Sequence, residues 1–219
     1  MISSAHARGR EAEGVRAMGM PSAERVWLAA DLADLPDDGN RYEVIDGELH
    51  VTPPPSLDHQ EEVGRLCMIL APYVDAQRCG HAFIGPADIT FSPARGVQPD
   101  VFVMPRTGPR RPRTFIEVGR LLLAAEVLSA STARWDRVNK RKVYREHKVP
   151  EYWIVDLDAR AFERSTPADE KPEVIRDRLT WQPEGAAEPL VIDVPQYFRD
   201  VLDAWQARGR YPTTAAYWY

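Results

Sequence analysis

The sequence predicts an α/β fold organised as a single domain. Its 219 residues suit one α/β domain with elaborations. Asp46-Gly47 stands between two alternating apolar runs, which is the strongest short signal for a β-hairpin. Further along the chain, short apolar strand-like runs are interleaved with helical patterns. Hydrophobic residues make up 44% and charged residues 28%, as is ordinary for a globular protein.

Apolar periodicity and turn residues place the expected elements. A helix start at 21–24 leads into 25–32, and later helices are expected at about 59–77, 133–147 and 197–207. Strands are expected at 42–45, 48–51, 81–84, 88–91, 100–104, 121–128, 151–156 and 160–164, with two more within 173–194. The chain shows no internal repeat.

The faces of the predicted hairpin follow from its two-residue turn. This turn sets Ile45 opposite Glu48 and Glu43 opposite His50, with all four side chains on one face. The other face is apolar and is expected to be the core face; it consists of Tyr42, Val44, Leu49 and Val51.

The ends of the chain differ in composition from the expected domain at 21–208. Residues 1–20 have no apolar signal-peptide core and are expected to form a disordered leader. Residues 209–219 form an aromatic tail with Tyr211 and Tyr217 to Tyr219, which either packs on a partner subunit or frays. No apolar run approaches the roughly 20 residues of a membrane span, so no membrane association is expected. Cys67 and Cys79 form no metal motif, and the default compartment is the cytoplasm.

Basic residues gather in two places although the net charge is -5. That charge argues against a general nucleic-acid coat protein but allows a local binding surface. One group lies in a Pro/Gly-rich loop and contains Arg106, Arg110, Arg111 and Arg113. The other lies on the helix expected at about 133–147 and at its end; it contains Arg134, Arg137, Lys140, Arg141, Lys142, Arg145 and Lys148.

Three polar residues in particular positions suggest chemistry. Glu126 lies near the end of the apolar run 121–128, where a carboxylate is costly unless it is paired or bound to a metal, or else ends the strand and faces solvent. Asp100 follows Pro99 at a strand start, which by itself is common turn chemistry. Lys140, with Tyr144 one turn later, can equally belong to a solvated basic helix. Together, two carboxylates and a lysine favour a site for Mg²⁺ and a phosphate.

At this point the sequence resembles a known family. The resemblance to the Uma family of putative restriction endonucleases, in the PD-(D/E)XK nuclease superfamily, runs from about Trp27 to about Glu163. The matching pieces are Tyr42 to Leu49, His59, Gln98 to Val101, Glu126 to Ser129, Asp136 with Lys140 and Tyr144, and Val149 to Asp156.

The resemblance implies both a fold and a site. The implied fold is a restriction-endonuclease-like core with a mixed central β-sheet flanked by helices and an N-terminal β-hairpin. Asp100, Glu126 and the backbone carbonyl of Val127 would bind Mg²⁺, with Mn²⁺ as a substitute. The superfamily's usual lysine position, two residues after the glutamate, is here Leu128, and Lys140 on the following helix is the match. Glu48 corresponds to the hairpin glutamate and would complete the acidic cluster or hold a second metal; its alternative is a surface residue beside a turn. Supporting contacts are expected from Tyr144, Ser129, Gln98 and Asp88, and from His59, which would hydrogen-bond the cluster or else cap its helix.

The implied function is hydrolysis of DNA phosphodiester bonds by a metal-dependent endonuclease. Contacts to the phosphate backbone are expected from Arg106, Arg110, Arg111, Arg113, Arg137 and Arg141. The alternative is a module on the same fold that binds nucleic acid or a protein without cutting. A homodimer is also expected, because two-fold protein symmetry matches the symmetry of a duplex.

Overall fold

The computed structural model describes residues 25–203 except 112 and 130. The predicted leader at 1–20 and the aromatic tail with Tyr211 and Tyr217 to Tyr219 lie outside the described residues. The first described element is a 3-10 helix, η1 (Ala29–Asp34). It begins four residues later than the start predicted for the segment 25–32, because Leu28 has an extended backbone.

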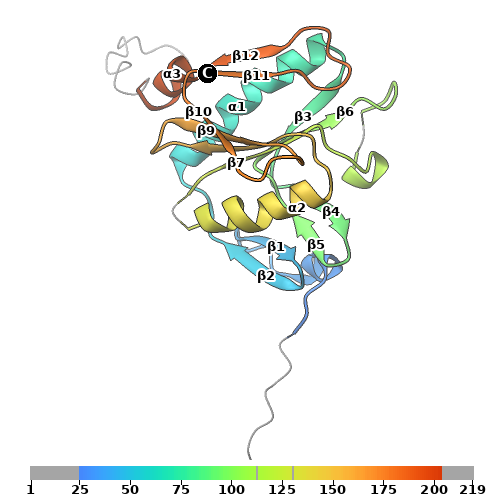
Figure 1. The fold of residues 1–219 in the computed structure, drawn as a ribbon. Coiled ribbons are helices and arrows are strands. Elements are labelled where there is room, and N and C mark those ends of the chain that lie inside the picture. Colours follow the sequence, from blue (N-terminus) through green and yellow to red (C-terminus); the bar gives the residue numbers. More distant parts are fainter. Residues whose placement is uncertain (1–24, 112, 130, 204–219) are drawn as a thin grey trace, which may run out of the picture.

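A six-stranded mixed sheet forms the centre of the fold, as predicted (Figure 1). Its strand order is β10-β9-β8-β7-β6-β3. The strands are β3 (Gly80–Ile84), β6 (Val101–Pro105), β7 (Leu123–Val127), β8 (Tyr152–Asp156), β9 (Ala161–Ser165) and β10 (Glu173–Ile175). Only β7 and β8 pair in parallel, and the other neighbours are antiparallel.

A four-stranded sheet contains the N-terminal hairpin. Its order is β2-β1-β5-β4, with β1 (Arg41–Ile45), β2 (Glu48–Thr52), β4 (Ile89–Ser92) and β5 (Arg95–Val97). Asp46 and Gly47 have φ values of 54° and 88°, as a tight hairpin turn requires, and the register is the predicted one. Strand β5 is not among the predicted strands, because its three residues are too few to show an alternating pattern.

The two faces of the hairpin differ from the prediction. Val44 is buried, as predicted, but Val51 on the same predicted core face is 46% exposed. Ile45 and Glu43, on the face predicted to be polar, are 2% and 3% exposed. The reason is that side chains of the helical segment after β7 cover this face: Trp135 stacks on His50 and bonds Glu43. The hairpin therefore contributes to the protein interior through both faces.

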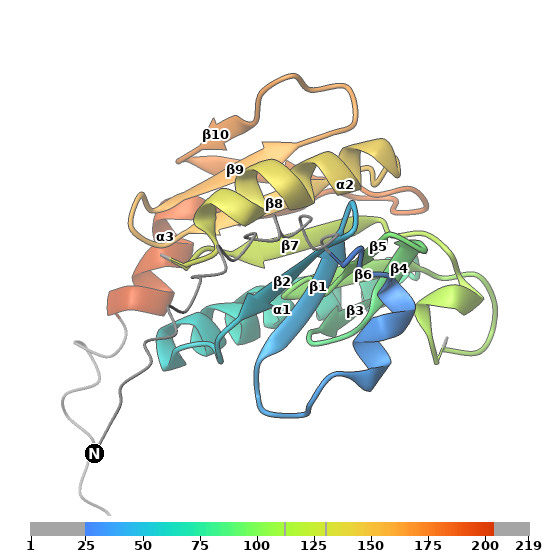
Figure 2. The ribbon, with the colours of Figure 1, turned by 90° about the horizontal axis from the view of Figure 1, so that it is seen from below.

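Helices cover both faces of the central sheet (Figures 1 and 2). The long helix α1 (Leu57–Ala76) lies on one face and begins at Ser56, whose side chain accepts a hydrogen bond from the His59 N–H. On the other face, a π-helical turn, η3 (Trp135–Lys140), continues directly into α2 (Arg141–Glu146). The predicted helix 133–147 is thus present, but its first part is wider than an α-helix.

Alternate residues of the central strands pack into two separate cores. On the α1 face, Val101, Val103 and Ala125 belong to one cluster with Leu66 and Leu70 of α1. On the α2 face, Phe102, Ala124 and Ile154 belong to a second cluster with Val143 and Tyr144 of α2. This alternation is what a strand buried on both faces requires. It also means that Asp100 and Glu126, in phase with Phe102 and Ala124, face the α2 side.

The C-terminal part closes the α1 side of the fold (Figure 1). Strands β11 (Arg178–Trp181) and β12 (Leu190–Asp193) form a two-stranded sheet, so that 173–194 contains three strands instead of the predicted two. The closing helix consists of α3 (Val194–Phe198) and a π-helical turn, η4 (Arg199–Asp203). Within the described part of the chain, no helix has the length and apolarity needed to cross a membrane.

Glu62 of α1 is a buried acid beneath this closing helix. Its side chain is fully buried, and one carboxylate oxygen accepts a very short hydrogen bond from the Tyr197 hydroxyl of α3. Burial raises the pKa of Glu62 from an ordinary value of 4.5 to about 7, although the Tyr197 hydrogen bond opposes the shift. The folded state therefore holds this proton more tightly than the unfolded chain does.

The raised pKa of Glu62 predicts a specific dependence of stability on pH. Its contribution to the free energy of unfolding, roughly 3 kcal/mol, is fully present below about pH 4.5 and is lost as the pH rises to about 7. In urea unfolding, the free energy of unfolding of the wild type should fall across this range relative to Glu62→Gln, which has no proton to lose. Asp75→Asn, an exposed acid of the same helix, is the control and should keep the wild-type slope. Parallel pH profiles for the wild type and Glu62→Gln would contradict the prediction.

Candidate active site

Asp100 and Glu126 lie across from each other on two neighbouring strands. Strands β6 and β7 pair with Val101 opposite Ala125, and one further step sets Asp100 opposite Glu126. Opposite residues of an antiparallel pair share one face, so both carboxylates point to the α2 side. The side chains are 3% and 1% exposed. Two predicted site residues are therefore brought together in the interior.

Contacts from three elements hold the Asp100 carboxylate. Oδ2 accepts hydrogen bonds from the Val127 N–H at 2.8 Å and lies 3.1 Å from His59 Nε2, while Oδ1 pairs with Arg41 Nη1. Burial alone would raise the pKa of Asp100, but the His59 hydrogen bond and the Arg41 charge hold it well below its usual range. The backbone is held too: the Gly85 N–H donates to the Asp100 carbonyl at 2.8 Å.

Lys140 reaches the same site from the helical segment after β7. Its ammonium nitrogen lies 3.0 Å from Glu126 Oε2, 2.9 Å from Glu43 Oε1 and 3.6 Å from Asp136 Oδ1. The side chain is only 5% exposed. Burial alone would lower the pKa of Lys140, but the charges of Glu126 and Glu43 outweigh it and raise the pKa above its ordinary value. The ammonium is therefore charged within a ring of carboxylates.

The hairpin glutamate in this ring is Glu43, which corrects the expectation for Glu48. Glu48 pairs with Ile45 beside the turn and is exposed. Glu43 lies two residues further from the turn on the same face, where its carboxylate accepts hydrogen bonds from the Gln98 N–H at 2.6 Å and Trp135 Nε1 at 3.2 Å. The sequence signal was present, because a charged residue between Tyr42 and Val44 interrupts an apolar strand.

Glu126 lies at the centre of the buried charges. Tyr144 donates its hydroxyl to Glu126 Oε1 at 3.1 Å, as expected for a residue one turn after Lys140. Burial raises the pKa of Glu126 well above its ordinary value; Lys140 offsets part of the shift, and the Asp100 charge adds to it. Asp136, also buried, has a raised pKa for the same first reason. Burial therefore disfavours the charged form of both carboxyl groups, and Lys140 partly offsets this effect.

The charge and donor atoms of this cluster are compatible with a divalent cation. Four buried carboxylates, those of Glu43, Asp100, Glu126 and Asp136, face two cations, Lys140 and Arg41. Carboxylate oxygens are the ligands that Mg²⁺ prefers. Across the described residues, no group of three or more His, Cys, Asp or Glu side chains is arranged as a metal site. Asp100, Glu126 and the Val127 carbonyl could hold an ion once Arg41 releases an oxygen of Asp100 and Lys140 releases an oxygen of Glu126.

The remaining predicted site residues lie around this cluster. Gln98 donates its side-chain amide to Asp88, and its carbonyl accepts from Lys140 Nζ at 3.4 Å. Two buried atoms, Gln98 Oε1 and His59 Nδ1, have no hydrogen-bond partner in the described part of the chain. Ser129 bonds Ser131 and Thr132 instead of the carboxylates. The expected contact of Ser129 with the acidic cluster is therefore corrected: its hydroxyl organises the start of the helical segment.

Two cavities lead toward Asp100 and His59. One of about 120 Å³ is lined by Arg41, His59, Asp100 and Gly85, among others. A polar cavity of about 410 Å³ lies at the carboxyl ends of the parallel strands β7 and β8, where His59, Ser129 and Asp156 line it. His59 separates the two. A ligand at the larger cavity would therefore approach the same histidine that holds Asp100.

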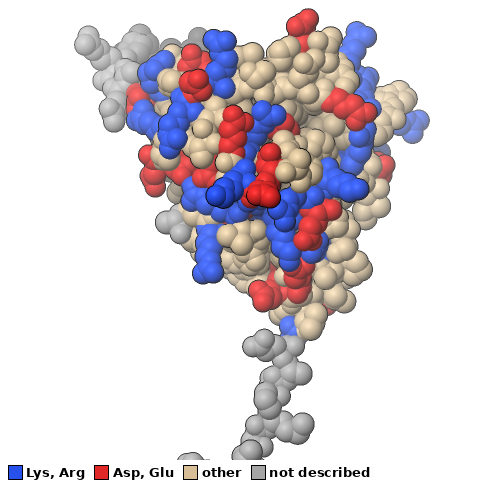
Figure 3. All heavy atoms as spheres, in the orientation of Figure 1, with Lys and Arg blue, Asp and Glu red and all other residues tan. Residues whose placement is uncertain are grey.

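The predicted nucleic-acid contacts divide into two groups. Arg137 pairs with Asp156 and Glu163, and Arg141 bonds the Ser165 hydroxyl and the Asp169 carbonyl. The face over α2 accordingly mixes acidic and basic side chains (Figure 3). In contrast, the four arginines of the loop have no ion-pair partner among the residues that the structure describes. They are Arg106, Arg110, Arg111 and Arg113. Among these predicted contacts, the loop arginines are therefore the ones without an ion pair, although Arg111 lies over the Phe83 ring.

Comparisons with known proteins agree with this fold. A solved structure described as a putative nuclease belonging to DUF820, from Anabaena variabilis, is similar with a TM-score of 0.64 and 21% sequence identity. The match covers 80% of this chain and 99% of that chain, and at this identity it shows a common fold. A search of curated proteins found no match. The model of the Uma2 family, described as "Putative restriction endonuclease", matches residues 29–195. The chain therefore belongs to the Uma2 family.

Proposed function

We propose that this protein hydrolyses phosphodiester bonds of DNA as a Mg²⁺-dependent endonuclease, with Mn²⁺ as a substitute. The observation that carries the proposal is the position of Lys140, whose ammonium lies 3.0 Å from Glu126 across the strand pair from Asp100. The superfamily's usual lysine position is occupied by Leu128, so a lysine from the next helix supplies the missing group. Two carboxylates and one ammonium in a buried site are the groups that metal-assisted phosphate hydrolysis needs.

Each residue of the site has a chemical task in this proposal. Asp100, Glu126 and the Val127 carbonyl would hold the ion, which would supply activation of a water molecule and neutralisation of charge on the phosphate. Lys140 donates a hydrogen bond to that water or to a phosphate oxygen. His59 and Tyr144 orient Asp100 and Glu126 through the hydrogen bonds described above. Arg41, once released from Asp100, has a phosphate as its alternative partner in the adjoining cavity.

Binding of DNA is assigned to the arginine loop, defined as residues 106–113. Its unpaired guanidinium groups can contact backbone phosphates. Backbone contacts fix the position of the duplex and carry no sequence information. The proposal therefore includes no sequence specificity. A homodimer, which would match the two strands of a duplex, remains an expectation because the aromatic tail lies outside the described residues.

A second candidate function is binding of nucleic acid without cleavage. One observation favours it: both oxygens of Asp100 and both oxygens of Glu126 already have protein partners. A site whose carboxylates are satisfied by Arg41 and Lys140 needs no metal to be stable. This candidate predicts DNA binding that is unchanged by Mg²⁺ and by EDTA.

The first test is a cleavage assay with duplex, single-stranded and branched DNA in Mg²⁺, Mn²⁺ or EDTA. The wild type should cut only with a divalent ion, and Glu126→Gln should reduce cutting to the EDTA background while weakening Mn²⁺ binding in calorimetry. Glu48→Gln is the matched control, because this exposed glutamate lies outside the cluster and should leave both properties unchanged. Binding of DNA with neither cleavage nor metal binding would support the second candidate instead.

A second test separates Lys140 from metal binding. Lys140→Met should retain binding of Mn²⁺, because it removes a cation that competes for Glu126, but should lower the cleavage rate about 100- to 1000-fold. Its stability should fall by about 3 to 5 kcal/mol, as is usual when one partner of a buried ion pair is lost, so cleavage is measured at a temperature where urea unfolding shows it to be folded. Lys142→Met changes an exposed lysine of α2 and should cut normally. Full activity of Lys140→Met would remove the lysine from the mechanism.

A third test addresses the arginine loop. Replacing Arg110, Arg111 and Arg113 with alanine should weaken DNA binding and reduce the slope of log affinity against log salt concentration by up to about 3. The control replaces three exposed basic residues outside this loop, Lys171, Arg176 and Arg178, and so removes the same charge. Equal salt slopes in the wild type and the loop variant would exclude the loop from the interface.

A further inference from the structure

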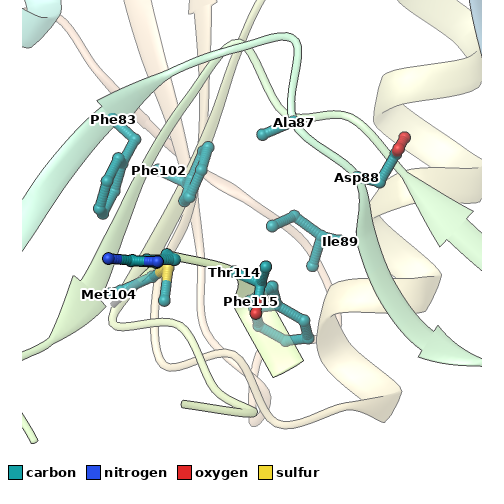
Figure 4. A pocket seen from close by; sticks show the side chains of 9 residues that line it. Phe83, Ala87, Asp88, Ile89, Phe102, Met104, Thr114 and Phe115 are labelled. Carbon is teal, nitrogen blue, oxygen red and sulfur yellow. The ribbon is translucent and has the colours of Figure 1, made fainter. Parts of the chain in front are cut away.

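A further cavity of about 290 Å³ lies beside the candidate active site, and three of its nine lining residues are phenylalanines. Figure 4 shows Phe83 and Phe102 on one side of this cavity, Ala87 and Ile89 on the other, and Phe115 at its base. Phe102 and Ile89 are almost wholly buried, at 3% and 1% exposure, whereas Phe83 is only half-buried. The cavity therefore has firm apolar walls and an accessible aromatic side. We call it the aromatic pocket.

The aromatic pocket is connected to the candidate active site through strand β6. Phe102 lies two residues after Asp100, so the two side chains share one face of the sheet and their Cα atoms are about 7 Å apart. Asp88, another residue of the pocket, accepts a hydrogen bond from Gln98 Nε2 at 2.8 Å. Gln98 in turn donates its backbone N–H to Glu43 in the acidic cluster. The walls of the pocket and the carboxylates thus belong to one connected unit.

The rings of the pocket are arranged for stacking on a flat group. Phe83 and Phe102 stack with ring centroids 5.2 Å apart and planes 15° apart. The planar guanidinium of Arg111 lies 4.7 Å from the Phe83 ring centroid. The Phe83 ring therefore already has a flat polar group on it, and a base that stacks on Phe83 would take the place of the Arg111 guanidinium, which could then pair with a phosphate. A nucleobase has the same requirement for an aromatic face, and stacking of bases on such side chains is tolerant of sequence.

The charge around the pocket also matches a nucleotide. Arg113 belongs to its lining and Arg111 to the group over Phe83, and both come from the arginine loop. Neither has an ion-pair partner among the residues that the structure describes. An apolar peptide or lipid would fill the aromatic walls but would leave these guanidinium groups unmatched. A nucleotide matches both, because its base is flat and aromatic and its phosphate is anionic.

We propose that the aromatic pocket binds the base of an unpaired nucleotide next to the phosphate held at Asp100 and Glu126. This inference rests on the proposed function and refines its substrate class: the preferred DNA has an unpaired base near the cut site, either in a single strand or extruded from a duplex. A base stacked inside a duplex cannot enter this pocket without leaving the stack. The base in the pocket would set the position of the strand over the carboxylates.

The test measures binding in the non-cutting Glu126→Gln background with Ca²⁺ present. The probe is a short DNA with one unpaired 2-aminopurine, whose fluorescence falls when the base stacks. Phe83→Leu keeps an apolar side chain but removes the ring, and should weaken binding of this probe about 5- to 100-fold. Phe83→Trp retains a ring and should restore quenching of the fluorescence. A probe with an abasic nucleotide at the same position should bind equally well to the Glu126→Gln protein with Phe83→Leu and to the Glu126→Gln protein without it.

Phe91→Leu is the matched control for this experiment. Phe91 is also half-buried and contacts Phe115, but it stacks on His147 outside the pocket lining. The Phe91→Leu variant should bind every probe as tightly as the Glu126→Gln protein without it. Equal loss for the base-containing and abasic probes in Phe83→Leu would overturn the proposal, because the ring would then support the loop and not a base. No loss for either probe would overturn it as well.

Two further arms separate this inference from the proposed function. A fully paired duplex with 2-aminopurine should show a change in fluorescence only if the protein extrudes the base, which distinguishes extrusion from capture of a single strand. If the wild type cuts no DNA but base-dependent binding persists, the nuclease proposal fails and the pocket stands. If the wild type cuts DNA and Phe83→Leu acts equally on base-containing and abasic probes, the pocket fails and the nuclease proposal stands.

Discussion

The buried ammonium of Lys140 is the interaction on which the arrangement of the candidate site depends. Moving a charged group out of water costs several kcal/mol unless it is paired and hydrogen-bonded. Here the partners come from different parts of the fold: Glu43 from β1, Glu126 from β7 and Asp136 from the same helical segment. The Lys140 ammonium therefore joins the four-stranded sheet, the central sheet and the helical segment of η3 and α2 at a single point. A shift of any of the three elements would leave a carboxylate buried without its cation, so the cost of an unpaired charge keeps the site in register.

The topology of the central sheet explains how a distant lysine reaches Glu126. Strands β7 and β8 are the parallel neighbours in this sheet, and a parallel connection needs a crossover, usually helical. That crossover contains η3 and α2, and it lies on the face that Glu126 shares with Ala124. A lysine at the position of Leu128 would reach this face along the strand, because alternate residues point the same way. Lys140 instead reaches this face from η3, which packs over it, so the position of Leu128 can hold an apolar side chain.

Local patterns in the sequence predict the secondary structure and the strand register of this protein better than its long-range side-chain contacts. The Asp46-Gly47 turn specifies φ values and hence register, so the hairpin pairing could be predicted residue by residue. A carboxylate in an apolar strand is costly, and this made Glu126 visible. The choice between Glu43 and Glu48 could not be made in this way, because both lie on one face and the position of Trp135, 92 residues from Glu43, decides it. Arg41 pairs with Asp100 across 59 residues, a contact for which no local pattern exists. The π-helical turn likewise leaves the apolar spacing of the helix almost unchanged.

Counting basic residues along the chain overestimates the surface that is free to bind an anion. The helical segment with the most lysines and arginines uses several of them in contacts within the protein: Arg137 pairs with Asp156 of β8 and Glu163 of β9, and Lys142 pairs with Asp46 of the hairpin turn. The two Arg137 pairs hold this helical segment against the central sheet. The arginine loop makes no such pairs among the described residues, so its charge remains for a ligand. Two of these arginines lie at the aromatic pocket, where Arg113 belongs to the lining and Arg111 lies over Phe83. A polyanion that binds these arginines would meet local positive charge beside the acidic cluster, which offsets repulsion from a chain whose net charge is -5.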